Sequence, residues 1–168
     1  MPQAEPIETL ILASGNGGMY VAWHMARSGR RTAVVERRWI GGSCPNINCL
    51  PSKNEIWSAK VADLVRHGAS FGAKTDSVPI DMAKVRQRKR DMVKGEVAAV
   101  LRQYEASGAE LIMGTGNFVA PKTLEVRLND GGTRALAADQ VFINIGTHAT
   151  IPNVPGLDAA GQRRVQDH

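Results

Sequence analysis

The N-terminal part of the chain alternates between short apolar runs and glycine-rich turns. Residues 9–14 (T-L-I-L-A-S) form an apolar run that ends in a cluster of glycines, which is typical of a buried parallel strand. Residues 19–28 carry a helical pattern, and Gly29 is a suitable helix stop. Residues 31–36 (R-T-A-V-V-E) predict a second strand. Together these elements predict a β-α-β unit.

The middle of the chain is predicted to be helical. A helix begins within residues 39–52 and continues through residues 54–67, residues 68–79 resemble a loop, and residues 81–106 predict a long charged helix. The basic stretch at 86–90 is typical of the solvated face of a helix, so we do not expect nucleic-acid binding. The apolar positions predicted to face the core are Met82, Val85, Met92, Val97, Val100 and Leu101.

From Ala109 onward the pattern changes to short strands. The tripeptide Asp130-Gly131-Gly132 is a strong hairpin signal. Residues 151–156 (I-P-N-V-P-G) are predicted to be extended because of their prolines. The whole pattern predicts an α/β fold, with a parallel sheet and helices followed by a small antiparallel β-meander. The candidate strands are residues 110–113, 117–120, 123–128, 134–137 and 140–145.

Length and charge narrow the function classes only slightly. A chain of 168 residues is one domain, or one domain with a small appendage. The net charge of +5 suits anionic ligands such as phosphates, although a generally basic surface gives the same value. No run of 18 apolar residues predicts a membrane span. Residues 1–8 are polar and acidic, unlike a signal peptide, so we expect a cytoplasmic protein.

The glycine cluster is the first candidate for chemistry. Residues 13–18 read A-S-G-N-G-G and approach the dinucleotide-binding pattern G-x-G-x-x-G, with Ala13 in place of the first glycine. In that pattern, glycines permit a tight turn and let phosphates approach the N-terminus of the following helix. Glu36 lies about twenty residues further on, where an acidic side chain accepts hydrogen bonds from a ribose. A surface loop would also contain glycines, but the flanking elements favour dinucleotide binding.

Cys44 and Cys49 bracket four residues at a predicted loop-to-helix transition. A disulfide between them requires a distorted first helical turn. The N-terminus of a helix lowers the pKa of a thiol, which favours redox chemistry. We expect no metal site, because zinc needs about four ligands and the four histidines are scattered. A structural disulfide or two buried free cysteines remain as alternatives.

One segment carries a resemblance to a known family. Residues 41–53 read G-G-S-C-P-N-I-N-C-L-P-S-K, which resembles the redox-active motif G-G-T-C-x-N-x-G-C-x-P-S-K of the flavoprotein disulfide reductases. That class I pyridine nucleotide–disulfide oxidoreductase family includes dihydrolipoamide dehydrogenase, glutathione reductase and mercuric reductase. Further similar segments are the glycine cluster with Glu36, residues 114–118, and Gly146-Thr147 followed by residues 151–156.

The resemblance implies a Rossmann-like FAD-binding domain and an electron path. Electrons would pass from NAD(P)H through FAD to a Cys44–Cys49 disulfide, and then to a small disulfide or thiol substrate or a mercuric ion. By position, Cys44 exchanges with the substrate, Cys49 faces the flavin, and Lys53 lies near the flavin as a third catalytic residue. The parent protein is expected to be a homodimer. The implied cofactor-binding residues are Gly15, Asn16, Gly17, Gly18, Glu36, Arg37, Gly42, Ser43, Lys53, Gly116 and Gly146.

The resemblance also implies an incomplete domain. Residues 1–157 match the first part of a discontinuous FAD domain, and residues 158–168 form a tail that leads toward an absent NAD(P)-binding domain. A truncated, non-catalytic FAD- or nucleotide-binding module is the alternative reading. Besides Ala13, two departures are Ile145 for a threonine and Asn48 for a glycine, where asparagine tolerates a left-handed backbone.

The positions of the two cysteines relative to the helix start predict different reactivities for their thiols. Cys44 lies in the turn before the helix, and Cys49 lies one turn further in. We therefore expect Cys44 to be the more exposed and more reactive thiol. The positive end of the helix and Lys53 are expected to lower both pKa values. Pro51 is predicted to lie early in a helix that begins near Cys49, where a missing N–H costs least.

Overall fold

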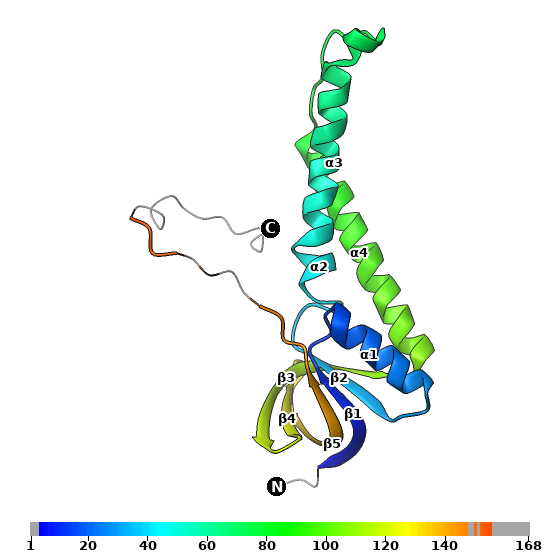
Figure 1. Cartoon of the computed structure of the whole chain (residues 1–168), viewed down its shortest axis with the longest axis vertical. Helices are drawn as coiled ribbons and strands as arrows, with labels where there is room; N and C mark the ends of the chain where they lie inside the picture. The colour runs from blue at the N-terminus through cyan, green and yellow to red at the C-terminus, as the bar shows by residue number, and fades with distance from the viewer. Residues whose placement is uncertain (1–3, 148–149, 151, 156–168) are drawn as a thin grey trace.

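A small sheet and a pair of long helices make up the part of the chain that the structure describes, as Figure 1 shows. The computed structural model describes residues 4–147, 150 and 152–155. In chain order the elements are β1 (Glu5–Leu12), α1 (Asn16–Arg27), β2 (Thr32–Glu36), α2 (Ser43–Asn46), α3 (Cys49–Arg66), the 3-10 helix η1 (Gly68–Phe71), α4 (Met82–Ser107), β3 (Glu110–Ala120), β4 (Thr123–Leu128) and β5 (Thr133–Ile143).

The strands close into a barrel in the order β1-β2-β3-β4-β5. Strand β1 lies between β2 and β5 and is parallel to both, and β2 is parallel to β3. The other two pairs, β3 with β4 and β4 with β5, are antiparallel. The predicted α/β fold with a parallel sheet and an antiparallel meander is therefore confirmed. The predicted hairpin is confirmed as well, since residues 130–132 form the turn between β4 and β5.

The parallel and antiparallel parts share the same long strands, which the sequence pattern did not predict. The candidate strands 110–113 and 117–120 are one continuous strand, β3, and 134–137 and 140–145 merge into β5. The first half of β3 pairs with β2 and the second half with β4. Gly114 and Gly116 interrupt the apolar pattern of β3, and they stay in the strand because neighbouring strands pack closely against them.

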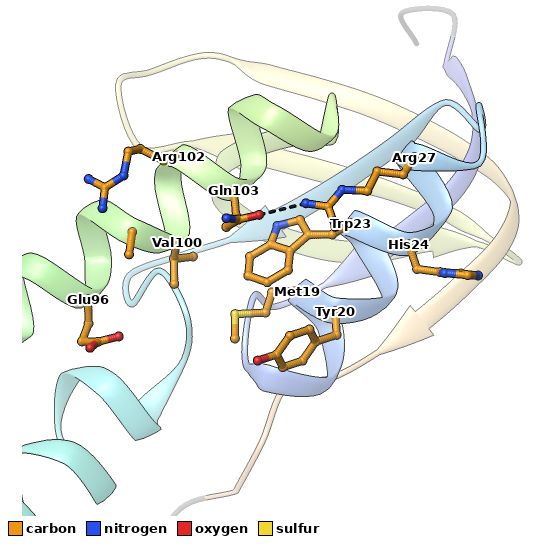
Figure 2. Close-up of a pocket in the computed structure, with 10 residues that line it drawn as sticks. Met19, Tyr20, Trp23, His24, Arg27, Glu96, Val100, Arg102 and Gln103 are labelled. Atoms are coloured by element: carbon orange, nitrogen blue, oxygen red, sulfur yellow. Dashed lines mark hydrogen bonds between the residues drawn. The ribbon is translucent and has the colours of Figure 1, made fainter.

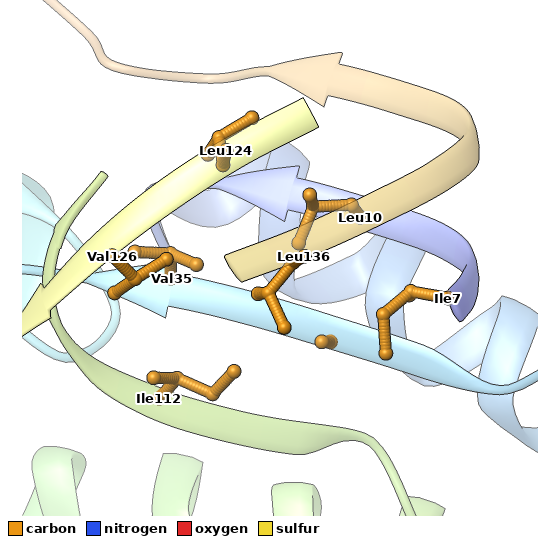
Figure 3. Close-up of a cluster of buried hydrophobic side chains, with 8 residues drawn as sticks. Ile7, Leu10, Val35, Ile112, Leu124, Val126 and Leu136 are labelled. Carbon is orange, nitrogen blue, oxygen red and sulfur yellow. The ribbon is translucent and has the colours of Figure 1, made fainter. Parts of the chain in front are cut away.

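Alternate residues of the strands face two separate apolar clusters. Leu10 of β1 faces the barrel interior, whereas its neighbour Ile11 faces the helices. This alternation is the expected consequence of the two-residue repeat of a strand. Figure 3 shows the barrel cluster, which consists of Ile7, Leu10, Ala33, Val35, Ile112, Leu124, Val126 and Leu136. The second cluster lies between the sheet and helices α1 and α4, and contains Ile11, Met19, Ala22, Trp23, Val34, Val100, Tyr104 and Ala109.

Helices α3 and α4 form an arm that extends away from the sheet (Figure 1). Cross-links between the two helices include the 2.7 Å ion pair of Lys89 with Glu55. Because most of α4 lies in this arm, away from the sheet, the prediction of its core-facing residues is largely wrong. Only Val100, at the sheet end, is buried, whereas Met82 is 54% exposed and Leu101 is 38% exposed. The remaining three predicted core positions are half-buried.

The predicted β-α-β unit is confirmed as β1, α1 and β2, with shifted boundaries. Strand β1 ends at Leu12 instead of Ser14, because Ala13 takes a positive φ of 76° that no strand residue adopts. Gly29 follows the end of α1 with a φ of 85°. The expected loop at 68–79 begins with η1.

Two further expectations concern the ends of the chain and its helices. Residues 152–155 have no regular secondary structure, and the ends of the predicted segment 151–156 lie outside the described residues, as does the tail 158–168. None of the described helices is long and apolar enough to cross a membrane.

Candidate functional site

The glycine turn (residues 13–18) joins β1 to α1 through a tight bend. A side chain at Gly18 would place its Cβ 2.5 Å from the carbonyl oxygen of Ala13, so only glycine fits where the helix meets the turn. Ala13 itself has a φ of 76°, a left-handed conformation that is unfavourable for an alanine. The departure from the first glycine of the pattern is therefore a point of backbone strain.

The start of α1 is suited to an anion. The first N–H groups of a helix have no intrahelical partner, and the first turn of α1 contains no acidic residue and no capping side chain. The peptide dipoles of the helix add a partial positive charge at this end. The predicted residues Gly15, Asn16, Gly17 and Gly18 all lie here, so the turn has the donors and the electrostatics to hold a phosphate.

The carboxylate of Glu36, at the end of β2, is 6% exposed and lies behind the glycine turn. Oε2 accepts hydrogen bonds from the backbone N–H (2.9 Å) and the hydroxyl (2.7 Å) of Ser14. Oε1 accepts from the backbone N–H groups of Arg38 (2.8 Å) and Trp39 (3.0 Å). A carboxylate has about four acceptor positions, and these donors use all of them. The ribose-binding role of Glu36 stays a prediction, and a ribose hydroxyl would compete with these internal donors.

The cysteine loop (residues 41–53) touches the glycine turn directly. Gly42 has a φ of 78°, and a Cβ on it would lie 2.6 Å from the Cα of Gly15. Two hydrogen bonds from the side-chain amide of Asn46, to the carbonyl oxygens of Ile40 (2.9 Å) and Gly42 (2.8 Å), hold the loop in shape. The glycine turn and the cysteine loop therefore lie against each other.

A break between two helices brings the cysteines together. Cys44 lies in α2, Cys49 begins α3, and the backbone leaves helical geometry at Ile47 and Asn48. The predicted distortion is confirmed, and so is the start of α3 near Pro51. Asn48 has a φ of −122°, so the position does not use the left-handed backbone that asparagine tolerates.

The predicted difference in exposure between the two thiols is wrong, and their relative reactivity stays a prediction. Cys44 is half-buried, whereas Cys49 is exposed. Hydrogen bonding to Cys49 raises the pKa of the Cys44 thiol, and burial and the nearby charge of Cys49 raise it further, while a hydrogen bond with Asn16 opposes this. Neither the helix dipole nor Lys53, from which lowered pKa values were predicted, accounts for the burial of Cys44 or its contact with Cys49.

The remaining predicted residues lie at different distances from this site. Lys53 is exposed in the first turns of α3, and Ser43 begins α2. Arg37 is exposed after β2, and its carbonyl oxygen accepts a 2.9 Å hydrogen bond from Asn129. Gly116 lies within β3, where a Cβ would be 2.9 Å from a side-chain methyl group of Leu124, so a larger residue would crowd the barrel core. Gly146 follows β5 with a φ of 70°. Among the described residues, no group of three or more His, Cys, Asp or Glu is arranged to hold a metal ion.

Sequence reasoning missed Asn144, the residue that follows β5. Its side-chain Nδ2 lies 3.2 Å from the carbonyl oxygen of Gly15 and 3.4 Å from that of Ala13. The only available signal was a polar residue at the end of an otherwise apolar strand.

A groove of about 690 Å³ lies between α1 and α4, outside the glycine turn and the cysteine loop. Figure 2 shows Trp23 and Tyr20 along the groove, and Arg27 reaching across it to Gln103 with a 2.8 Å hydrogen bond. The indole of Trp23 packs edge-on against both Tyr20 and Tyr104. Burial raises the pKa of Tyr104, and the nearby charge of Glu36 adds to the shift. The groove thus follows the packing interface between α1 and α4, the two helices that pack on the sheet.

The chain is similar to known oxidoreductases in both sequence and fold. Residues 8–168 match the family model described as pyridine nucleotide-disulphide oxidoreductase. Curated relatives include the dihydrolipoyl dehydrogenases of Chlorobaculum tepidum (29% identical, covering 95% of this chain and 34% of the relative), Mycobacterium bovis (32%, covering 89% and 32%) and Bacillus subtilis (31%, covering 95% and 35%). The chain spans about one third of the length of these relatives.

A solved structure shares the fold. The Cu(II) complex of the HOCl-induced flavoprotein disulfide reductase RclA from Escherichia coli superimposes with a TM-score of 0.75 at 23% identity. The match covers 92% of this chain and 32% of that protein.

Proposed function

Because the chain belongs to the pyridine nucleotide-disulphide oxidoreductase family, we propose that it is the FAD-binding and dithiol segment of an NAD(P)H-dependent disulfide oxidoreductase. Members of this family are FAD-dependent oxidoreductases with NAD(P)H as the electron donor. The observation that carries the proposal is the close approach of Gly42 to Gly15, which places the cysteine loop against the phosphate-binding turn. A redox dithiol must lie beside the cofactor that reduces it.

The residues of the glycine turn fit the pyrophosphate of FAD. The free N–H groups and the dipole at the start of α1 bind its negative charge. Gly42 and Ser43 border the same space from the cysteine loop. Arg37, Gly116 and Gly146 remain proposed contacts to other parts of the cofactor. Glu36 supports this site from behind by holding Ser14, and its contact with the ribose remains part of the proposal.

The two cysteines supply the thiol chemistry. When bound, FAD accepts a hydride from NAD(P)H and supplies two electrons to the Cys44–Cys49 disulfide. In the dithiol form, Cys49 lies at the N-terminus of α3, and Cys44 lies in α2 on the other side of the break between the two helices. Hydrogen bonding to Cys49, together with burial, raises the pKa of the Cys44 thiol. Lys53, within the first turns of α3, adds positive charge on the flavin side.

The identity of the relatives narrows the proposed substrate. The curated relatives described above are dihydrolipoyl dehydrogenases, so we favour a small dithiol such as a dihydrolipoyl group over glutathione disulfide or a mercuric ion. The whole protein is proposed to be a cytoplasmic homodimer.

Flavin uptake tests the proposal. The purified chain is incubated with excess FAD, separated from free flavin by gel filtration, and examined for bound flavin by absorbance. The expected result is about one FAD per chain and, after two-electron reduction, a long-wavelength absorbance band that is absent from Cys49→Ser. Bound flavin without a cysteine-dependent band would support a non-catalytic FAD-binding module instead. Failure to retain any flavin would overturn the proposal.

A further inference from the structure

The side chain of Asn144 connects the end of β5 to the glycine turn. Its backbone N–H donates a 2.9 Å hydrogen bond to the carbonyl oxygen of Leu12, which fixes the residue beside the end of β1. From there its Nδ2 reaches the carbonyl oxygens of Gly15 and Ala13, at 3.2 Å and 3.4 Å. One carboxamide therefore bridges two carbonyl groups of the turn.

The glycines of the turn make room for this carboxamide. A Cβ added to Gly15 would lie 3.1 Å from Nδ2 of Asn144, and one added to Gly17 would lie 3.0 Å from its Oδ1. At Gly18 the distance to Nδ2 would be 2.8 Å. These three glycines border one space, and Asn144 fills it. The side chain is thus built into the turn, and its position does not result from surface packing.

Each peptide unit of the turn is planar, so the direction of its carbonyl group also fixes the direction of its N–H group. In a trans peptide, C=O and N–H point in opposite directions. The peptide that joins Ala13 to Ser14 shows the effect: its carbonyl faces Asn144, while its N–H donates to Glu36 on the opposite side. The next contacted peptide joins Gly15 to Asn16. Its carbonyl accepts a 2.9 Å hydrogen bond from the N–H of Met19 in the first turn of α1 and a 3.2 Å hydrogen bond from Asn144, so the N–H of Asn16 points toward the open start of α1.

The turn needs such an anchor because it contains strain. Ala13 adopts a φ of 76°, and a residue in a sparsely populated conformation persists only when its surroundings fix it. The hydrogen bonds of Ala13 N–H to Val35 (2.8 Å) and of Ser14 to Glu36 hold one side of the turn. Asn144 holds the other side.

We propose that Asn144 is a positioning residue for the phosphate-binding turn: by donating to the carbonyl oxygens of Ala13 and Gly15, its carboxamide aims the N–H groups at the start of α1 toward a bound pyrophosphate. This inference rests on the proposed function for the identity of the ligand, FAD. The geometry of the tether itself does not depend on that identity.

Two substitutions separate the hydrogen bond from the shape of the side chain. Asn144→Asp keeps the shape but replaces the donor with a carboxylate that faces two carbonyl oxygens. Asn144→Ala removes both donor and volume. Asn117→Asp, on the exposed part of β3, makes the same change of charge away from the turn. The measurements are the dissociation constant for FAD, by titration of flavin fluorescence, and the melting temperature without FAD.

The expected result is an increase in the dissociation constant of roughly tenfold for Asn144→Asp and roughly threefold to tenfold for Asn144→Ala, the range for one or two lost hydrogen bonds. Asn117→Asp should change it by less than about twofold. In the Ala13→Gly background, where the turn is no longer strained, Asn144→Ala should cost less affinity than in the wild type. That coupling would not arise if Asn144 only filled space.

The possible failures are distinguishable. If the wild-type chain binds FAD and Asn144→Asp binds it as well as Asn117→Asp does, the positioning role is overturned and the proposed function stands. If the wild-type chain binds no FAD, the proposed function is overturned. The melting temperatures then show whether the hydrogen bonds of Asn144 to Ala13 and Gly15 hold the turn. Equal melting temperatures of wild type and Asn144→Asp would overturn the tether too.

Discussion

The hydroxyl oxygen of Ser14 lies 2.7 Å from Oε2 of Glu36, and both residues are buried. The same hydroxyl lies 3.2 Å from the carbonyl oxygen of Trp39 and accepts a 3.1 Å hydrogen bond from the N–H of Gly41. Ser14 therefore connects the glycine turn, the end of β2 and the start of the cysteine loop. The residue is not a glycine of the dinucleotide pattern, yet it joins the three segments on which the site depends.

Removing the hydroxyl of Ser14 is expected to destabilise the protein. In Ser14→Ala, the buried carboxylate of Glu36 loses one of four donors, which costs about 1–3 kcal/mol. The measurement is the free energy of unfolding from urea denaturation. Ser28→Ala is the control, because its hydroxyl bond to Met25 is exposed, and a change within about 0.5 kcal/mol is expected there. Equal costs for the two variants would show that the Ser14 network adds no stability.

Adding a methyl group at two glycines is expected to have opposite effects. In Gly42→Ala the new Cβ would lie 2.6 Å from the Cα of Gly15, and the alanine would have to adopt a φ of 78°. The cysteine loop must then move away from the glycine turn, which should lower the free energy of unfolding by about 1–3 kcal/mol. Gly95 lies inside α4 with nothing near its missing Cβ. Gly95→Ala should therefore stabilise the protein by roughly 0.5–1 kcal/mol. Thermal denaturation of both variants tests the pair, and stabilisation by Gly42→Ala would contradict the close approach.

Limited alkylation of the reduced protein should label Cys49 before Cys44. Cys49 is exposed, whereas hydrogen bonding to Cys49 and partial burial raise the pKa of the Cys44 thiol and lower its thiolate fraction. The measurement is peptide mapping after brief treatment with iodoacetamide at neutral pH. In Cys49→Ala, the pKa of Cys44 should fall and its labelling should become faster. Preferential labelling of Cys44 in the wild type would restore the roles predicted from the sequence.

The stability that Arg134 provides should disappear in acid. Its guanidinium binds Glu5 of β1 (2.8 and 2.9 Å) and Glu110 of β3 (2.7 Å). Hydrogen bonding to Arg134 lowers the pKa of Glu5 below its ordinary value of 4.5. A lowered carboxyl pKa stabilises the fold above the unfolded-state value, and this contribution is lost as the pH falls through the folded-state value.

The melting temperatures of wild type and Arg134→Met should therefore differ most near pH 7 and converge below about pH 4. Arg127→Met, on the exposed part of the neighbouring strand β4, removes the same charge as a control. A difference that stays constant down to pH 2 would show that Arg134 acts through packing alone.

Local patterns in the sequence were sufficient for the elements and the motif residues. The β-α-β unit, the hairpin at Gly131 and the start of α3 near Pro51 all follow from short-range rules of turns and helix ends. The family resemblance assigned Gly15 and Gly42 to one cofactor site, and Gly42 contacts Gly15 in the fold.

The errors concern relationships between distant segments. The core face of α4 could not be predicted, because helical periodicity does not reveal where a helix projects beyond the sheet, as at Met82. The exposure of Cys49 depends on the direction in which α3 leaves the break after α2. Asn144 gains its partners only because β5 returns beside β1. None of these features has a local signature.

The pairing of β1 with β5 also sets an order of events during synthesis. Glu5 pairs with Leu136 and Leu12 with Ile143, so β1 is synthesised well before the strand that pairs with this edge. Leu136 lies 131 positions after Glu5, so at about 5–20 residues per second the delay is roughly 7 to 26 seconds. Throughout that time one edge of β1 is an unpaired apolar strand, the kind of surface that aggregates or recruits chaperones. Strand β1 is therefore the part of the barrel that is exposed longest before the barrel closes.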